Sequence, residues 1–437
     1  MKEKVSSRKL IILAVILYFL NSTIFCFIIY PKLQRKMDLN FDGEGYQKMA
    51  INILSGKGFF LGESDDPILR NHGKPTLLRP PLYPYFISLV YYMFGYNQTL
   101  IVVIHILVNL LMIFIIYQIA VKVFDRKTAF LSSFVLSLYP PFIWYLSRLY
   151  NENLFNILLA LSVLYAVKIF SDISLKNSII FGLLSGLTSL CKGQMIVYPL
   201  VLLPGLIYVY QSDIAKVVKR FSLMLIFMLL VISPWTVRNY IVSGKFVLIQ
   251  SGAAIHFMRG NALFEKNIGF SNPYHKNAMD EAFAKERKII KQFESVNKRK
   301  ITELELTEVF DNIVMEYIKN NPLRFIKKIL TGCLQFWYLG ESKVKSTGMA
   351  IIQFPLILFA IMGIYPVYKK RSKLIIPVYS LIIFFTVIHA ALLAISRYSI
   401  PVMPYVIILA SFGITNLYEN LFFSKKSRSQ EQELLNY

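Results

Sequence analysis

Residues 41–50, FDGEGYQKMA, are the first half of the stretch on which the fold of this chain depends. Helical spacing places Asp42, Tyr46 and Ala50 on one face, at positions i, i+4 and i+8. Glu44 lies a turn away, and the two flanking glycines loosen the start of the helix. The sequence therefore predicts a helix that begins with two neighbouring carboxylates.

The second half is residues 77–86, LLRPPLYPYF. It presents Arg79 immediately before a Pro-Pro step, which cannot continue a regular helix. Both halves lie between the first and second strongly apolar segments of the chain. Carboxylates and a fixed arginine at the edge of a membrane form a candidate reaction centre.

The composition is that of a polytopic membrane protein. Of 437 residues, 55% are hydrophobic and only 17% are charged, and short basic loops separate long apolar runs. The net charge of +23 follows from Lys and Arg in cytoplasmic loops, so no nucleic-acid partner is expected. Cys26, Cys191 and Cys333 are far apart, which supports neither a disulfide framework nor a zinc cluster.

The predicted topology begins with a basic N-terminus, residues 1–9, followed by an apolar run over residues 10–30 that lacks a cleavage site. This run is a first span with its N-terminus in the cytoplasm, so Asp42 and Arg79 lie outside. Residues 82–94 are too short to cross and predict an interfacial or re-entrant helix. The remaining spans are expected at 100–123, 130–146, 154–170, 179–190, 195–210, 221–235, 350–368, 374–395 and 399–421.

With these spans, every basic cluster between them falls on one side, as the positive-inside rule requires. The expected fold is an all-α bundle of about ten transmembrane helices with interfacial helices in the first outer loop. The predicted parts are a transmembrane catalytic module (1–240, with first outer loop 31–98), an extracytoplasmic or interfacial region (241–347), C-terminal transmembrane helices (348–423) and a cytoplasmic tail (424–437). Apolar residues at helical spacing within 280–320 predict amphipathic helices in the outer region.

Several charged residues fall at the same outer membrane level. They are Asp42, Glu44, Arg79, Arg148, Glu152, Lys192, Arg238 and Arg397. One charge at a helix end is usually an interface anchor. Carboxylates and arginines that come from distant loops and share one side of the membrane are more readily explained as a functional site. The arrangement suits transfer of a group from a phosphate-bearing lipid: arginines clamp the phosphate, and a carboxylate takes a proton from the nucleophile.

Several motifs together resemble the GT-C superfamily, in the group of protein O-mannosyltransferases and lipid A aminoarabinose transferases. The resemblance rests on DGEGYQKMA (42–50), RPPLYPYF (79–86), LSRLYNENLF (146–155), ISPWTVRNYIVSGKFV (232–247), RGN (259–261), NPLRFIKKILTGCLQFW (321–337) and RYSIPVMPY (397–405). These elements occur in the family's order at about its spacing, over residues 10–410.

The resemblance implies an inverting glycosyltransferase that uses a polyprenyl-phosphate sugar donor and an extracytoplasmic acceptor. Asp42 matches the first-loop aspartate that serves as general base or orients the acceptor, and Glu44 could share that role. Arg79 matches the cation that binds the donor phosphate, and Glu152 matches the second-loop acid. Arg238 and Arg397 match positions near the cavity rim.

Topology alone adds Arg148 and Lys192 to the phosphate-binding candidates. Tyr46 and Tyr83 are candidates for contacts with the substrate, although packing is the more common role of Tyr46.

Simpler roles stay open for these residues. Asp42 could cap a helix, and Arg79 could extend to the interface as an anchor. No metal site is predicted. A divalent cation held by Glu63, Asp65 and Asp66 stays open, although carboxylates in a polar loop are more often solvated.

Other functions also stay open: a transporter or flippase of lipid-linked saccharides, a non-catalytic membrane scaffold, or phosphotransfer from a lipid donor. The expected partners are the donor, the acceptor and membrane lipids. The compact loops favour the plasma membrane of a bacterium, with the active site on the extracytoplasmic side.

Overall fold

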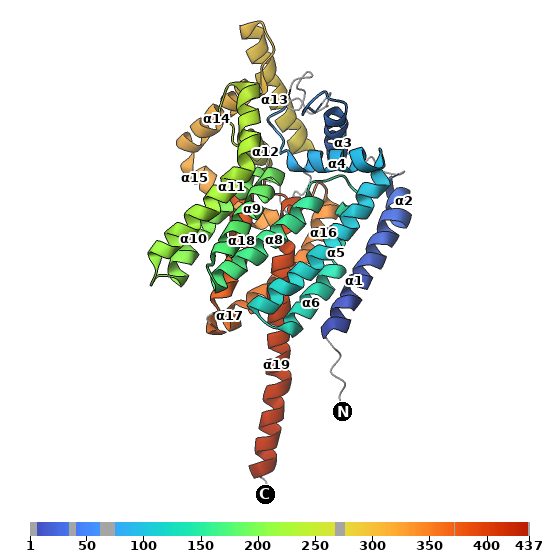
Figure 1. The fold of residues 1–437 in the computed structure, drawn as a ribbon, viewed down its shortest axis with the longest axis vertical. Helices are drawn as coiled ribbons and strands as arrows, with labels where there is room; N and C mark the ends of the chain where they lie inside the picture. Colours follow the sequence, from blue (N-terminus) through green and yellow to red (C-terminus); the bar gives the residue numbers. More distant parts are fainter. Residues whose placement is uncertain (1–6, 35–40, 62–74, 267–275, 371, 436–437) are drawn as a thin grey trace.

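A computed structural model describes residues 7–34, 41–61, 75–266, 276–370 and 372–435. All regular elements in these residues are helical (Figure 1). Those before residue 244 are α1 (Ser7–Ile24), the π-helical η1 (Phe25–Ile29), α2 (Tyr30–Gln34), α3 (Phe41–Leu54), α4 (Leu82–Phe94), α5 (Gln98–Val123), α6 (Arg126–Ser137), α7 (Pro140–Leu146), α8 (Glu152–Ser171), α9 (Leu175–Cys191), η2 (Gly193–Val197), α10 (Tyr198–Val209) and α11 (Ile214–Ser243).

The later elements form an outer group and a second membrane group. They are α12 (Ala253–Glu265), α13 (Lys276–Asn297), α14 (Glu303–Asn320), α15 (Pro322–Tyr338), α16 (Lys343–Met362), α17 (Ile364–Lys370), η3 (Lys373–Ile375), α18 (Ile376–Ala391), η4 (Ser396–Val402) and α19 (Met403–Leu435).

Each predicted span coincides with a helix or a pair of helices, which confirms the predicted fold class. Six segments of the described chain are long and apolar enough to cross a membrane. The bent pair of α6 and α7, with an angle of 52°, makes a seventh if it is one span. Helix α9 and the joined η2 and α10 are shorter apolar helices. The predicted count of about ten spans is therefore not confirmed.

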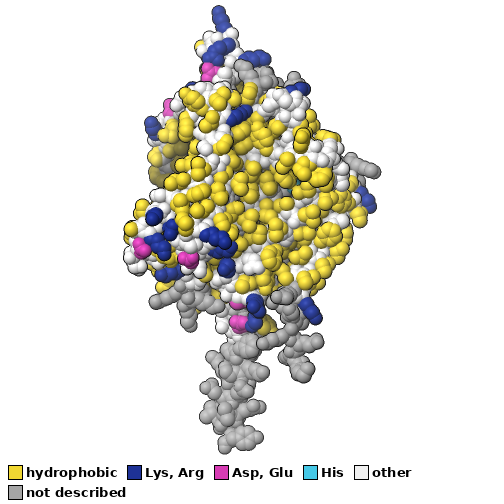
Figure 2. All heavy atoms as spheres, viewed as in Figure 1, with side chains coloured by type: hydrophobic (Ala, Val, Ile, Leu, Met, Phe, Trp, Pro, Cys, Tyr) yellow, Lys and Arg dark blue, Asp and Glu magenta, His cyan; other side chains and the backbone are white. Residues whose placement is uncertain are grey.

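The bundle presents a broad apolar surface, which Figure 2 shows as a band across the middle of the molecule. Lys and Arg gather along the lower edge of this band in the same view. Helix α4 is one of the shorter apolar helices and has 13 residues. It runs across the upper end of the bundle in Figure 1, as expected of a helix that does not cross.

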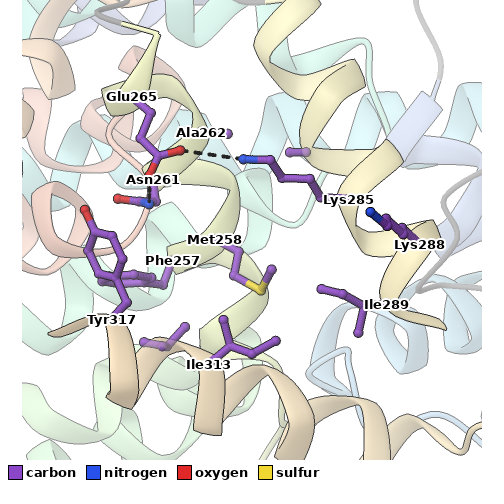
Figure 3. A pocket seen from close by; sticks show the side chains of 12 residues that line it. Phe257, Met258, Asn261, Ala262, Glu265, Lys285, Lys288, Ile289, Ile313 and Tyr317 are labelled. Atoms are coloured by element: carbon purple, nitrogen blue, oxygen red, sulfur yellow. Dashed lines mark hydrogen bonds and ion pairs between the residues drawn. The ribbon is translucent and has the colours of Figure 1, made fainter. Parts of the chain in front are cut away.

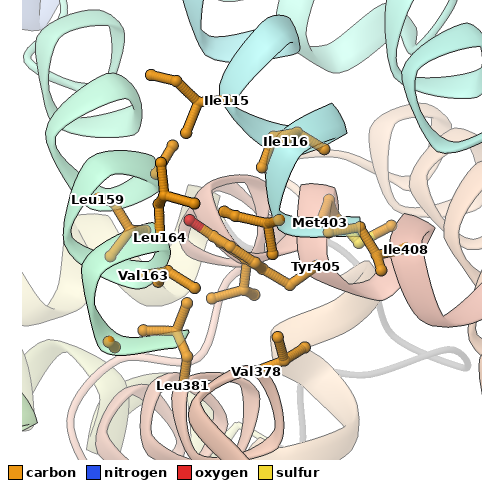
Figure 4. Packing of buried hydrophobic residues seen from close by; sticks show 14 of the residues in the cluster. Ile115, Ile116, Leu159, Val163, Leu164, Val378, Leu381, Met403, Tyr405 and Ile408 are labelled. Carbon is orange, nitrogen blue, oxygen red and sulfur yellow. The ribbon is translucent and has the colours of Figure 1, made fainter. Parts of the chain in front are cut away.

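The core of the bundle lies among α5, α8, α18 and α19 (Figure 4). Tyr405 of α19 is buried at its centre, between Ile116 of α5 and Leu381 of α18. Side chains from distant parts of the sequence therefore meet in one apolar cluster, and this packing fixes the ends of the helices relative to one another.

The outer helices α12, α13 and α14 lie at the upper end of the bundle (Figure 1). A capping box starts α14: Thr302 accepts a hydrogen bond from the Glu305 amide, and the Glu305 carboxylate accepts one from the Thr302 amide. Leu306 and Phe310 of this helix are buried. The prediction of amphipathic helices within 280–320 is confirmed.

Helices α9 and α11 pack closely because α9 presents two glycines four residues apart. A Cβ atom at Gly182 would lie 2.5 Å from the backbone oxygen of Met224, and one at Gly186 would lie 2.6 Å from Cβ of Val231. Small residues at this spacing allow helix backbones to approach in a membrane.

Gly182→Ala is therefore expected to force the two helices apart and to destabilise the protein by roughly 1–3 kcal/mol. The thermal unfolding midpoint of purified protein in detergent measures this change. Gly348→Ala on α16 is the matched control, because a Cβ atom there meets nothing within 4 Å. Equal midpoints for the two variants would contradict the proposed packing.

Candidate functional site

A cavity of about 360 Å³, here called the main cavity, lies where the outer helices meet the bundle. Its walls come from α3, the segment before α4, the start of α8, the junction of α9 and η2, α12, the end of α18, and η4. The charged and polar lining residues are Tyr46, Arg79, Asn151, Glu152, Lys192, Gln194, Gln250, Ser251, His256, His389, Arg397 and Tyr398. Five of the residues predicted from the sequence are therefore brought together: Tyr46, Arg79, Glu152, Lys192 and Arg397.

Glu152 joins two cations at the wall of this cavity. The carboxylate is the first residue of α8 and is only 1% exposed. Its Oε1 atom accepts hydrogen bonds from Nζ of Lys192 at 3.3 Å and from Nε of Arg397 at 3.0 Å, and its Oε2 atom accepts from Nη2 of Arg397 at 3.3 Å. The bidentate contact fixes the plane of the guanidinium as well as its position.

Lys192 keeps hydrogen-bonding capacity for a ligand. An ammonium group has three donors. Its one hydrogen bond to the described residues goes to Glu152. The side chain also lies over the ring of Phe155, with Nζ 5.0 Å from the centroid. Glu152 and the aromatic ring thus hold a cation at the cavity wall with donors to spare.

Arg79 is positioned through the residues that precede it. Its guanidinium lies over the ring of Tyr46, 5.5 Å from the centroid. The Thr76 amide donates to the carbonyl of Phe59 at 3.0 Å, and the Ser251 amide donates to the carbonyl of Leu77 at 2.8 Å. The Pro-Pro step that follows Arg79 removes two backbone donors and ends this extended segment at α4.

Arg238 and Glu303 hold the same segment from two sides. Nη1 of Arg238 donates to the carbonyl of Thr76 at 2.9 Å, and Nη2 donates to that of Phe59 at 3.3 Å. The Glu303 carboxylate accepts from the Leu77 amide at 2.8 Å. Arg238, predicted to bind phosphate, does not line the main cavity and contacts backbone carbonyls instead.

Glu303 makes the stability of this contact between α14 and residues 76–77 dependent on pH. Burial raises the pKa of its carboxyl group to about 7 from an ordinary 4.5. Between these values this carboxyl group binds more protons in the folded state than in the unfolded chain. Its contribution to the free energy of unfolding therefore falls as the pH rises from 5 to 7. Glu303→Gln keeps an oxygen acceptor for the Leu77 amide but cannot ionise.

Between pH 5 and pH 7 the thermal unfolding midpoint of the wild type is therefore expected to fall relative to that of Glu303→Gln, because the other groups that titrate in this range are the same in both proteins. The series ends at pH 7 because burial lowers the pKa of Lys328 to about 7, which gives stability the opposite dependence above that pH. Parallel curves for the two proteins would show that another group carries the dependence.

The other predicted residues lie elsewhere. Tyr83 packs edge to face against Tyr46, with ring centroids 5.1 Å apart, and its hydroxyl forms a hydrogen bond with Nε2 of His105 at 3.1 Å. It therefore contacts a residue of the cavity wall without lining the cavity itself. Arg148 lines a different cavity, described below. Asp42 and Glu44 belong to the first turn of α3, but their side chains lie outside the described part of the structure.

The structure adds cavity residues that the sequence analysis did not single out. Nε2 of His389 lies 2.9 Å from Nε2 of Gln194, and the His389 ring stacks on Tyr398 with centroids 4.4 Å apart. His256 comes from α12. One signal in the sequence was available, because Gln194 and Tyr398 lie in breaks between helices at the same membrane level as Lys192 and Arg397.

No group of three or more His, Cys, Asp or Glu residues suited to a metal ion occurs among the described residues. Glu63, Asp65 and Asp66, and with them the open question of a divalent cation, lie outside those residues.

A second pocket of about 300 Å³, the outer pocket, lies among α12, α13 and α14 (Figure 3). It has an apolar floor that includes Phe257, Met258 and Ile313. At its rim Glu265 accepts from the amide of Asn261 at 3.0 Å and pairs with Lys285 at 3.6 Å. Helix α12 therefore contributes to both cavities, with His256 in the first and Asn261 in the second.

Comparisons with known proteins agree with this architecture. Residues 78–237 match a family described as dolichyl-phosphate-mannose-protein mannosyltransferase. This segment contains Arg79, Glu152 and Lys192. No curated protein matches the sequence.

The AglB structures share the fold at low sequence identity, and the ArnT structure is less similar. The oligosaccharyltransferase AglB from Archaeoglobus fulgidus, in complex with an inhibitory peptide and a dolichol-phosphate, has a TM-score of 0.57 and 13% identity, over 98% of this chain and 52% of AglB. The same enzyme tethered to an acceptor peptide has a TM-score of 0.58 and 13% identity, over 97% and 51%. ArnT from Cupriavidus metallidurans bound to undecaprenyl phosphate has a TM-score of 0.40 and 13% identity, over 93% and 77%.

This chain spans about half the length of AglB. The family match and the similarity of fold confirm the resemblance found in the sequence: this chain folds like the oligosaccharyltransferase AglB, and residues 78–237 match a mannosyltransferase family.

Proposed function

We propose that this protein is an inverting glycosyltransferase that moves a sugar from a polyprenyl-phosphate donor to an extracytoplasmic acceptor. The observation that carries the proposal is the buried group of Lys192, Glu152 and Arg397 facing a cavity that also contains Arg79. Three cations from three distant segments surround a space large enough for a phosphate and part of a sugar. A phosphate ester is the ligand that such a group binds best.

In the proposed reaction an acceptor hydroxyl attacks the anomeric carbon of the donor sugar. A bond forms between the acceptor oxygen and this carbon while the bond from the carbon to the phosphate oxygen breaks. The electron pair leaves with the phosphate, and the hydroxyl proton passes to a carboxylate. Attack on the face opposite the leaving phosphate inverts the configuration.

The residues divide these tasks. Arg79, Lys192 and Arg397 bind the phosphate and stabilise the charge that it gains as it leaves. Glu152 is already bonded to two cations, so its task is to hold Lys192 and Arg397 in place. Asp42, with Glu44 beside it, is the proposed base. Tyr46 positions Arg79 through its ring.

The outer pocket lies on the far side of α12 from the catalytic residues, which suits a site for part of the acceptor. The protein is proposed to sit in the plasma membrane of a bacterium with its N-terminus in the cytoplasm and its active site outside. The acceptor is a lipid, a glycan or a protein, and the sugar is a hexose or a pentose.

The test is turnover of radiolabelled polyprenyl-phosphate sugars, offered as a panel of hexosyl and pentosyl donors to the purified protein in detergent. Transfer or hydrolysis of one donor supports the proposal and identifies the sugar. If folded protein binds a donor but moves it across a vesicle bilayer without cleaving it, the protein is a flippase and the proposal is wrong.

Arg79→Ala is expected to weaken donor binding and to raise KM for the donor by roughly 10- to 100-fold, because one charge-assisted contact to the phosphate is lost. Initial rates across a range of donor concentrations measure the change. Arg324→Ala, at an exposed position on α15, is the control. An unchanged dependence on donor concentration would count against Arg79 as a phosphate ligand.

A further inference from the structure

Arg148 lines a separate cavity of about 290 Å³, here called the side cavity, between α7, the start of α16 and η4. Most of its wall is apolar, with Pro141, Trp144, Met349 and Ile352 among the lining residues. The main cavity lies on the other side of Arg397, whose side chain lines both. None of the proposed roles in sugar transfer uses this second space.

The guanidinium of Arg148 is buried and pairs with no anion among the described residues; Glu341, which also lines the side cavity, pairs with Lys345. The residue is 8% exposed, and its Nη1 atom donates to the hydroxyl of Tyr150 at 3.2 Å. Its Nε and Nη2 atoms have no hydrogen-bond partner, and it forms no ion pair with the residues that the structure describes. The side chain lies between aromatic rings, with its central carbon 5.1 Å from the centroid of Trp144 and 5.6 Å from that of Tyr150.

Such an arrangement is costly in the absence of a ligand. A buried cation needs an anion and hydrogen-bond acceptors to replace the water that it has lost. The aromatic rings supply part of this but cannot accept hydrogen bonds from two edges of the guanidinium. An anion in the side cavity would supply both charge and acceptors.

The shape and place of the cavity indicate an amphiphile rather than a free ion. Helix α16 belongs to the candidate span Lys343–Tyr368, and only 17% of the residues in the most apolar window of this span are buried, so much of its surface is accessible. The cavity lies beside the first turns of this helix, where Gly348 leaves open space. The first turns of a membrane-spanning helix lie where lipid head groups meet the acyl region, and the apolar wall suits the upper part of a lipid chain.

We propose that the side cavity binds an anionic phospholipid of the bilayer, with its phosphate against Arg148 and its glycerol and upper acyl chain against the wall of α16. Tyr150 links this site to the catalytic group, because its ring lies 4.3 Å from the central carbon of Arg397 while its hydroxyl bonds Arg148. The lipid therefore stabilises the loop that carries Glu152. The inference does not depend on glycosyl transfer.

The test is native mass spectrometry of the delipidated protein with dioleoylphosphatidylglycerol, dioleoylphosphatidylcholine or undecaprenyl phosphate. The wild type is expected to retain one phosphatidylglycerol at least tenfold more tightly than phosphatidylcholine. Arg148→Gln is expected to lose at least tenfold in this affinity. Gly348→Phe, which places a ring in the open space of the cavity and keeps the arginine, is expected to lose as much, so the test stands even if Arg148→Gln does not fold.

Two matched controls are expected to bind as the wild type does: Val344→Phe, at a residue of α16 that is 82% exposed, and the exposed Arg324→Gln. The proposal is wrong if Arg148→Gln and Gly348→Phe bind phosphatidylglycerol like the wild type, or if phosphatidylcholine binds equally well. Retention of undecaprenyl phosphate alone, or displacement of the lipid by millimolar inorganic phosphate, would also overturn it by identifying a carrier site or a free-anion site.

Discussion

Glu152→Gln is expected to destabilise the protein by roughly 3–5 kcal/mol, because it leaves two cations at the wall of the main cavity without their shared anion. The carboxylate side chain is 2% exposed, and those of Lys192 and Arg397 are 10% and 23% exposed, so water replaces little of the lost interaction. The new amide would also place an NH₂ group where one oxygen now accepts two hydrogen bonds.

The measurement is the thermal unfolding midpoint in detergent, together with transfer activity. Glu341→Gln is the matched control, because Glu341 also pairs with a lysine, Lys345, but both side chains are exposed. The control is expected to change the midpoint little. A second variant, Glu152→Gln with Lys192→Met, removes one of the stranded cations and is expected to recover part of the loss.

Loss of activity at temperatures where Glu152→Gln is still folded would show that Glu152 positions the phosphate ligands. A variant with normal stability and normal transfer would contradict both the network and its role.

The sequence could predict that four charged residues lie at one end of the bundle. Counting spans and basic loops placed Arg79, Glu152, Lys192 and Arg397 on one side, and all four line one cavity. Their contacts could not be predicted, because Glu152 and Arg397 are 245 residues apart and only the packing of α8, α18 and α19 brings them together.

The sequence does not show in which direction around the bundle each residue faces. Arg148 and Arg238 were placed at the same level as the other cations, but one faces the side cavity and the other faces the segment before Arg79. A helical pattern gives the apolar face of a helix, not which neighbour covers it.

The environment of Glu303 could not be predicted from the sequence either. Its helix was correctly predicted as amphipathic, and in such a pattern a glutamate at the first turn would be expected to face solvent. The structure leaves it half-buried, because the outer helices pack on residues 76–78, which are 225 or more residues earlier in the chain. A long-range contact of this kind leaves no periodic signal.

Asp42→Asn is expected to lower the rate of transfer by roughly 10²- to 10⁴-fold, the usual contribution of a general base. The argument rests on the register of α3. Residue 42 is one helical turn before Tyr46, and Tyr46 lines the main cavity beneath Arg79. The helix is anchored by the contact of Tyr46 with Tyr83 and by a hydrogen bond from Gln47 to the hydroxyl of Tyr91 at 3.3 Å. Asparagine has nearly the same shape as aspartate but cannot take up the proton.

The effect is expected in kcat with little change in KM for the donor, because the phosphate ligands are untouched. Glu44→Gln decides which of the two acids is the base, and Asp280→Asn, at an exposed position on α13, controls for a general loss of negative charge. If Asp42→Asn keeps near-normal kcat while Glu44→Gln loses it, the proton goes to Glu44. If both variants transfer normally, the base does not come from α3, and the role of this helix is to hold Tyr46 against Arg79.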